Sequence, residues 1–80
     1  MEHPCNLSQL SPGEKGEVLT LQTAGAMRRR LLDLGLAEHT EVMCLGQSPL
    51  GDPKAYLIRG AVIAIRAIDS RKILISRKQP

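Results

Sequence analysis

The clearest amphipathic stretch of the chain lies at residues 27–36. On a helical projection with Met27 at 0°, Leu31 falls at about 40° and Leu34 at about 340°. These three side chains form a narrow apolar stripe that would face a core. Leu32 falls at about 140°, so it lies outside the stripe, on the outward flank.

This stretch predicts a short basic helix over residues 24–34. Thr23 can cap its N-terminus, and Gly35 can adopt the left-handed conformation that ends a helix. The outward Leu32 lies beside Arg28 on the helix surface. An apolar side chain held on a rigid element is a typical protein contact, so we interpret the helix as a docking element.

The remaining apolar residues follow the patterns of β-strands. Residues 1–9 show no period and include a proline, so we predict a loosely held lead-in there. Two prolines and a glycine exclude regular structure from Ser48–Pro53. We predict one helical turn at 67–72 and strands at 16–21, 40–46, 54–58, 62–66 and 73–76.

Five short strands at close spacing, with one short helix between the first and the second, predict a mainly-β fold. We expect a small five-stranded barrel, because closure removes the exposed edges of an open sheet. The 80 residues leave room for one hydrophobic core. Residues 1–80 therefore form a single domain whose ordered part spans about 7–76.

Tyr56 is the only aromatic residue in the chain. Proteins that bind single-stranded nucleic acids stack bases on aromatic rings, and domains that bind proline-rich peptides line their grooves with such rings. One tyrosine supplies neither surface. The composition argues against both functions and leaves aliphatic side chains as the means of recognition.

Positive charge gathers in the C-terminal third of the chain. Residues 1–53 hold four basic and seven acidic residues, a net −3, whereas residues 54–80 hold seven basic and one acidic residue, a net +6. An acidic partner or an anionic surface fits this third, and so does a solvated basic face without a partner. Binding of RNA through the strands from Lys54 onward is the least favoured alternative, because aromatic rings are missing.

The histidines and cysteines lack the spacing of a structural metal site. His3 and Cys5 are two positions apart, and His39 and Cys44 are five apart, unlike the Cys-x-x-Cys pattern of zinc sites. We therefore expect no metal ion and no cofactor, and we place Cys44 in the core. A metal sensor or carrier that uses His3 and Cys5 is the alternative to a docking module.

The sequence offers no catalytic constellation. It contains no local pairing of serine or cysteine with histidine and no phosphate-cradling glycine loop, so we expect a protein without enzymatic activity. We recognise no signal peptide, and the longest apolar run, residues 61–65, is far too short to span a membrane. A cytoplasmic location with reduced thiols is expected.

The loop Ser48–Pro53 carries a second apolar side chain at its middle, Leu50. Two arrangements are open. Leu50 folds back over the open end of the barrel, or it stays exposed as a contact point for another protein. Asp52 would stabilise the turn through its backbone, and we do not interpret it as a ligand.

The three consecutive arginines of the predicted helix leave a similar choice. They fan over roughly 200° of the helix surface, so they cannot all serve one contact. Arg29 can pair with Asp33 one turn later, and the stem of Arg30 can pack on the barrel. Arg28 is the candidate for a partner contact; a solvated or locally paired role for all three is the alternative.

Four motifs follow one another along the chain: Arg-Arg-Arg-Leu-Leu-Asp-Leu-Gly-Leu at 28–36, Ser-Pro-Leu-Gly-Asp-Pro at 48–53, Tyr-Leu-Ile-Arg-Gly at 56–60 and Ile-Ala-Ile-Arg at 63–66. Their order and spacing resemble the FeoA family, small cytoplasmic accessory proteins of bacterial ferrous iron transport. The resemblance implies an SH3-like barrel. It also implies a role beside FeoB, the membrane permease with a cytoplasmic GTP-binding domain.

Together with the outward leucines, the resemblance predicts one contact surface made of the helix and the loop. We expect the domain to dock on the cytoplasmic part of a FeoB-like permease and to support or regulate ferrous iron uptake. It would be peripheral to the membrane through this partner, and the apolar helix flank also leaves a homodimer open. The predicted contact residues are Arg28, Leu32, Leu36, Pro49, Leu50, Gly51, Asp52 and Pro53.

Overall fold

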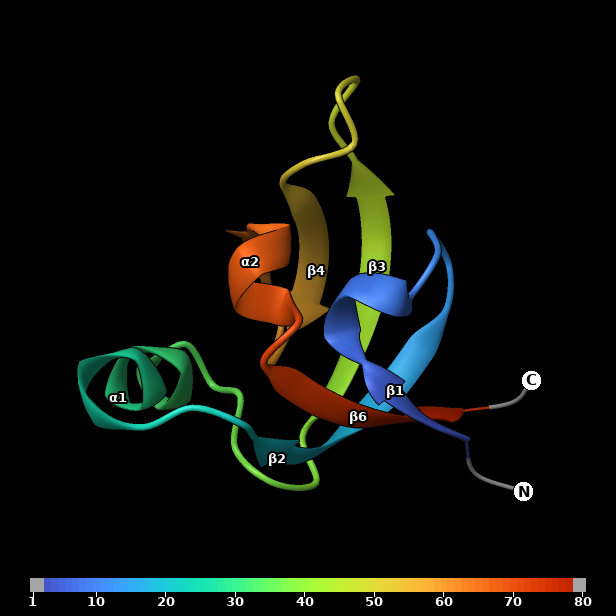
Figure 1. Ribbon diagram of the computed structural model, residues 1–80. Coiled ribbons are helices and arrows are strands. Elements are labelled where there is room, and N and C mark those ends of the chain that lie inside the picture. Colours follow the sequence, from blue (N-terminus) through green and yellow to red (C-terminus); the bar gives the residue numbers. More distant parts are fainter. Residues whose placement is uncertain (1–2, 79–80) are drawn as a thin grey trace.

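The computed structural model describes residues 3–78, which form one curved antiparallel sheet with short helices around it (Figure 1). The elements are β1 (His3–Asn6), η1 (Leu7–Gln9), β2 (Lys15–Leu21), α1 (Gly25–Asp33), β3 (Glu41–Gln47), β4 (Lys54–Ile58), β5 (Ala61–Ile65), α2 (Ala67–Ser70) and β6 (Ile73–Lys78). The strand order is β1-β6-β2-β3-β4-β5. The mainly-β class is confirmed, with six strands in place of the five predicted. Within residues 3–78 the sheet is open, and β1 and β5 are its edges.

The additional strand, β1, lies in the segment predicted as a loose lead-in. It pairs with β6 from His3 opposite Arg77 to Asn6 opposite Leu74. Pro4 is tolerated because β1 is an edge strand, where one side of the backbone needs no ladder partner. This strand shifts the count, so that α1 lies between the second and third strands and not between the first and second.

A β-bulge changes which side of β2 faces the core. The alternation places Leu19 and Leu21 on one face, but the register against β6 shifts between Val18 and Thr20. Leu19 is the extra residue, so Leu21 returns to the face of Val18. Val18 and Leu21 are both buried, whereas Leu19 is half-buried.

The core is aliphatic around a single ring, as the composition requires. Tyr56 is fully buried, and its hydroxyl lies 3.4 Å from the carbonyl oxygen of Leu7. Burial raises the pKa of Tyr56 to about 12. Cys44 is buried beside it, as predicted, and burial raises the pKa of its thiol. The other buried apolar residues are Leu7, Leu10, Val18, Leu21, Leu31, Leu36, Val42, Ile58, Ile65, Ile73 and Ile75.

The predicted helix and its apolar stripe are present. Leu31 is buried, and Met27 and Leu34 pack against the core from the same face of α1. The predicted cap at Thr23 is wrong: the residue before the helix is Ala24, and no side chain caps it. In Figure 1, α1 stands to one side, beyond the end of β2. Among the described residues, no helix has the length and apolar character that a membrane crossing needs.

Gly35 ends α1 in the way the sequence predicts. It has φ +102°, and its N–H donates to Leu32 O at 2.9 Å. The next amide, of Leu36, donates to Leu31 O at 3.1 Å. This pair of bonds is a Schellman motif, in which the residue after the glycine packs back on the last turn of the helix.

Candidate functional site

The loop between β3 and β4 is closed by its own hydrogen bonds. Ser48 N–H donates to Pro53 O at 3.2 Å, and Gly51 N–H donates to Ser48 O at 2.8 Å. The Ser48 hydroxyl also donates to Asp52 O at 2.8 Å. These bonds give a defined shape to a segment that projects beyond the sheet at the top of Figure 1.

Asp52 ties this loop to the rest of the domain. Its carboxylate Oδ1 accepts a hydrogen bond from Ala67 N–H at 2.8 Å, the first amide of α2. A carboxylate at the N-terminus of a helix satisfies an amide that has no partner within the helix. The sequence predicted only a backbone role for Asp52, whereas its side chain joins two segments that lie far apart in the chain.

The two leucines predicted as contact points are exposed. Leu50 has 93% of its surface exposed, so it does not fold back over the sheet, and Leu32 has 40% exposed. The prediction that Leu36 is a contact residue is wrong, because Leu36 is completely buried. It is the residue after the glycine of the Schellman motif and packs in the core with Leu31. Leu36 therefore cannot touch a partner.

The arginines of α1 are exposed, and one of them is used within the fold. Arg28 donates from Nη1 to Leu21 O at 3.4 Å, a long contact that helps hold the helix to the end of β2. The ion pair predicted between Arg29 and Asp33 does not form in the described structure. Arg30 is solvent-exposed. Arg28 and Leu32 thus share an outward helix face.

The helix and the loop do not form one continuous surface. In Figure 1, α1 lies at the lower left and the loop at residues 48–53 projects at the top, with α2 and β4 between them. The predicted contact residues therefore fall into two groups. Arg28 and Leu32 make up the helix group, and the loop group comprises Pro49, Leu50, Gly51, Asp52 and Pro53.

An apolar groove of about 460 Å³, which was not predicted from the sequence, lies beside the base of the β3–β4 loop. Both faces of β3 carry apolar side chains, so the outer face needs a cover. No helix covers it, because α1 lies beyond the sheet. Leu45 faces outward at a register shift of β3 against β4, and Val62 is 67% exposed. The lining residues include Leu45, Pro53, Ala55, Val62 and Ala64.

The sequence feature that could have predicted this groove is the composition of β5. Its five residues, Ala-Val-Ile-Ala-Ile, carry no polar side chain on either face. Such a strand reads as buried on both sides, yet only Ile65 is buried and Ile63 half-buried. An apolar edge strand that the fold leaves uncovered marks a candidate contact surface.

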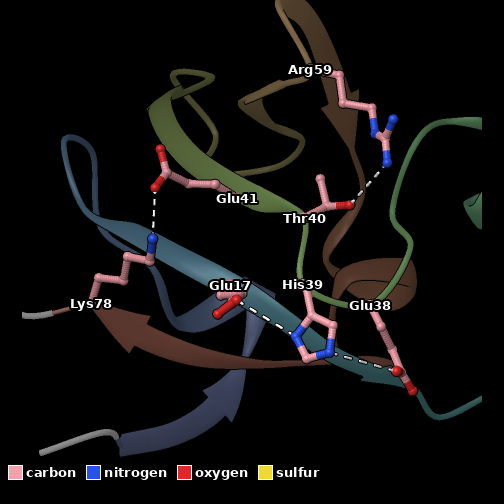
Figure 2. A network of polar contacts seen from close by, with 7 residues as sticks. All are labelled: Glu17, Glu38, His39, Thr40, Glu41, Arg59 and Lys78. Atoms are coloured by element: carbon pink, nitrogen blue, oxygen red, sulfur yellow. Dashed lines mark hydrogen bonds and ion pairs between the residues drawn. The ribbon is translucent and has the colours of Figure 1, made fainter.

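A second cleft, of about 490 Å³ and with both polar and apolar lining residues, lies between the turn before β3 and the β4–β5 turn. Figure 2 shows His39 between two carboxylates, with Nδ1 at 3.6 Å from Glu17 and Nε2 at 4.0 Å from Glu38. Arg59 approaches Thr40 with 3.5 Å between Nη2 and Oγ1. The side chain of His39 is largely exposed, so these long contacts are weak.

The ion pair between Lys78 and Glu41 flanks this cleft. Lys78 Nζ donates to Glu41 Oε2 at 2.8 Å, and this bond lowers the pKa of Glu41 and raises that of Lys78. The acidic side chains of the cleft therefore lie against cations or His39. The cleft offers a mixed lining and not a field of one sign that would select an anion or a cation.

The described residues contain no group of three or more histidine, cysteine, aspartate or glutamate side chains that could hold a metal ion. Cys5 is half-buried and packs against the core. The side chain of His3, its proposed companion in a metal site, lies outside the described part of the structure. The side chains that the structure describes thus contain no cluster of metal-ligand residues.

Comparison with known proteins relates the chain to ferrous iron transport proteins. It is 28% identical over 67 residues to a Fe(2+) transport protein A/Fe(2+) transporter FeoB fusion protein of Porphyromonas gingivalis. The match covers 84% of this chain and 8% of that protein, so the chain spans a small part of the length of this relative.

Solved structures match over most of the chain. The FeoA protein of Chlorobium tepidum matches with a TM-score of 0.83 and 33% identity, covering 90% of this chain and 69% of that one. Stenotrophomonas maltophilia FeoA, described as an SH3 domain protein complexed with zinc, matches with a TM-score of 0.77 and 24% identity over 88% and 87% of the two chains. The fold is therefore SH3-like. The sequence model of the FeoA domain family matches residues 5–77, so the chain belongs to the FeoA family.

Proposed function

We propose that this domain is a non-enzymatic accessory protein of bacterial ferrous iron uptake that docks on the cytoplasmic part of a FeoB-like permease. The observation that carries the proposal is the fusion in Porphyromonas gingivalis, where a region similar to this chain and a FeoB transporter share one polypeptide. Fusion keeps two domains at a high effective concentration, which is useful when they work in contact.

The loop group supports a docking role. Leu50 stands almost fully exposed on a loop that is closed by internal hydrogen bonds and tied to α2 by Asp52. Ordering such a loop on binding costs little conformational entropy, because its shape is already set. A rigidly held apolar side chain that fills a pocket on a partner contributes binding energy through the apolar surface that it buries.

The helix group supplies a second contact. Leu32 and Arg28 face outward on α1, and Arg28 offers a cation beside the apolar side chain. Because α1 and the loop lie apart, the two groups would touch different parts of the permease or act at different times. In this role the domain sits in the cytoplasm and reaches the membrane only through its partner.

Binding of variants to the cytoplasmic part of the permease from the same organism tests this proposal. We expect Leu50→Glu to weaken binding at least tenfold, because a carboxylate cannot enter an apolar pocket without a partner. Leu32→Glu should have a smaller effect, since less of Leu32 is exposed. Thr20→Glu is the matched control: it places the same charge at an exposed position of β2, in neither contact group. If folded Leu50→Glu and Leu32→Glu both bind like the wild type, the two contact groups are wrong.

A further inference from the structure

The sheet ends at β5, whose outer backbone has no partner within residues 3–78. The two-residue turn at Arg59 and Gly60 makes Ile58 and Ala61 a hydrogen-bonded pair. Hydrogen-bonded pairs then alternate along an antiparallel ladder, so Ile63 also bonds to β4. The N–H and C=O groups of Val62 and Ala64 therefore point away from the sheet, where a further strand could pair with them.

β5 lacks the features that usually prevent an exposed edge strand from pairing with another chain. Edge strands are commonly protected by proline or by charged side chains, and the opposite edge, β1, carries Pro4. No residue of β5 is charged or proline. Val62 and Ala64 also line the apolar groove on the outer face of β3, β4 and β5. An added strand would therefore find backbone partners and an apolar surface for alternate side chains.

Positive charge lies at both ends of this apolar edge. Arg59 precedes β5 and Arg66 follows it, and both side chains are exposed. Among the described residues, the long contact to Thr40 is the only polar contact of the Arg59 side chain, and Arg66 forms no ion pair. The carboxylate of Asp52 is bonded to the amide of Ala67, the residue after Arg66.

These charges disfavour a second copy of the chain as the added strand. In a symmetric antiparallel pair centred on Ile63, Arg66 of each copy would face Gly60 of the other and lie next to its Arg59. Two such pairs of like charges would form, one at each end. A segment with acidic residues at both ends would instead neutralise Arg59 and Arg66.

We infer that the edge of β5 is a strand-addition site for an extended segment of another protein, with an apolar, β-branched centre and acidic residues at both ends. The added strand pairs with Val62 and Ala64 and lays alternate side chains into the groove lined by Leu45 and Ala55. This site borders the loop group, because Pro53 lines the groove, but Leu50 and the helix group are not among its lining residues. It does not require the partner to be a permease, so the two proposals can fail independently.

A synthetic peptide tests the site directly. The probe is acetyl-Glu-Glu-Val-Thr-Val-Thr-Val-Glu-Glu-amide, titrated into the isotope-labelled domain and followed by NMR. We expect saturable shifts at the amides of Val62 and Ala64, and amide exchange at these two positions slowed at least tenfold. The same peptide with lysine in place of glutamate should bind at least tenfold more weakly at low salt.

Two controls distinguish strand pairing from non-specific binding of the peptide. A peptide N-methylated at the valines keeps the side chains but loses the donors, and it should not bind. Val62→Pro removes one outward N–H at an edge position where proline is tolerated, and it should abolish binding by a domain that remains folded. The inference is overturned if no saturable shift occurs, if the N-methylated peptide binds equally well, or if the shifts fall outside β5. Protection of Val62 and Ala64 by dimerisation without peptide would assign the edge to a second copy and overturn it as well.

Discussion

The carboxylate of Asp52 accepts a hydrogen bond from the backbone N–H of Ala67 at 2.8 Å and so joins the β3–β4 loop to the start of α2. The same residue accepts from the Ser48 hydroxyl through its carbonyl. Asp52 thus helps to fix the shape of the loop through its carbonyl and the position of the loop on the domain through its carboxylate. Because the exposed Leu50 lies in this loop, Asp52 determines how rigidly Leu50 is presented.

Removing this carboxylate should loosen the loop. We expect Asp52→Ala to lower the free energy of unfolding by about 1 kcal/mol, the usual cost of losing a side chain that caps a helix. Asp52→Asn keeps an oxygen acceptor and should cost clearly less. Urea unfolding of the two variants measures the difference. Equal stability of Asp52→Ala and the wild type would contradict a supporting role for this bond.

Gly35 should tolerate no larger residue. Its φ of +102° suits glycine, and a Cβ there would lie 3.1 Å from Arg59 Cδ and 3.4 Å from Ile58 Cγ2. We expect Gly35→Ala to lower the free energy of unfolding by about 1–2 kcal/mol. Gly46→Ala is the matched control, because its Cβ would meet nothing within 4 Å and its φ is not positive. Thermal or urea unfolding that shows equal losses for both variants would contradict the account of Gly35.

Tyr56 should make the domain sensitive to alkaline pH. Burial raises its pKa from 10.0 to about 12, so the folded state favours the neutral phenol. This contribution to stability is fully present below pH 10 and is lost as the pH rises toward 12. The loss should amount to about 2 kcal/mol. Tyr56→Phe has no phenol to ionise, so its unfolding free energy should fall less over this range.

The measurement is simple because Tyr56 is the only aromatic residue. The ultraviolet absorbance of tyrosinate follows its ionisation without interference from another ring. Ionisation in the folded protein at the ordinary pKa of a free tyrosine would show that the ring is more accessible than the structure has it.

The ion pair between Lys78 and Glu41 should shift the pKa of Glu41 measurably but contribute little to the free energy of unfolding. The hydrogen bond from Lys78 lowers the pKa of Glu41, so the pair contributes at neutral pH and is lost as the pH falls through that pKa. In Lys78→Gln the pKa of Glu41 should rise toward its usual value, whereas Lys72→Gln should leave it unchanged. NMR titration of the Glu41 carboxyl at low salt measures the shift. No difference between the two variants would exclude the pair in solution.

The elements set by local sequence could be predicted well. The spacing of Met27, Leu31 and Leu34 fixed the core face of α1, and Gly35 fixed its end, because both signals lie within a few residues. The hairpin of β4 and β5 was placed within a residue for the same reason. These patterns depend on neighbours in the chain and not on the rest of the fold.

The misplaced features depend on contacts between distant segments. β1 has no period of its own and exists because β6 lies ready to pair with it. The bulges at Leu19 and Leu45 decide which side chains face outward, and no residue type announces either of them. Leu36 was predicted to be an accessible contact residue just beyond the helix, but the hydrogen bonds of the Schellman motif fold it back on Leu31.

The candidate site was predictable only in part, for the same reason. The sequence left open whether Leu50 folds back over the barrel or stays exposed, and the structure shows it exposed. The separation of this loop from α1 was not predicted, because it depends on how the sheet curves between β2 and β4. The groove beside Val62 was not predicted, because it depends on the position of α1, which lies beyond the sheet and leaves the outer face of β3 uncovered.

The central claim, that the domain supports ferrous iron uptake by docking through Leu50, is tested most directly by the rate of Fe²⁺ uptake in cells. Cells that carry only Leu50→Glu, at normal protein level, are compared with cells that carry Thr20→Glu and with cells that lack the protein. The account predicts that uptake with Leu50→Glu falls toward the level without the protein, while Thr20→Glu keeps the wild-type rate. Wild-type uptake with a folded, normally abundant Leu50→Glu protein would contradict it.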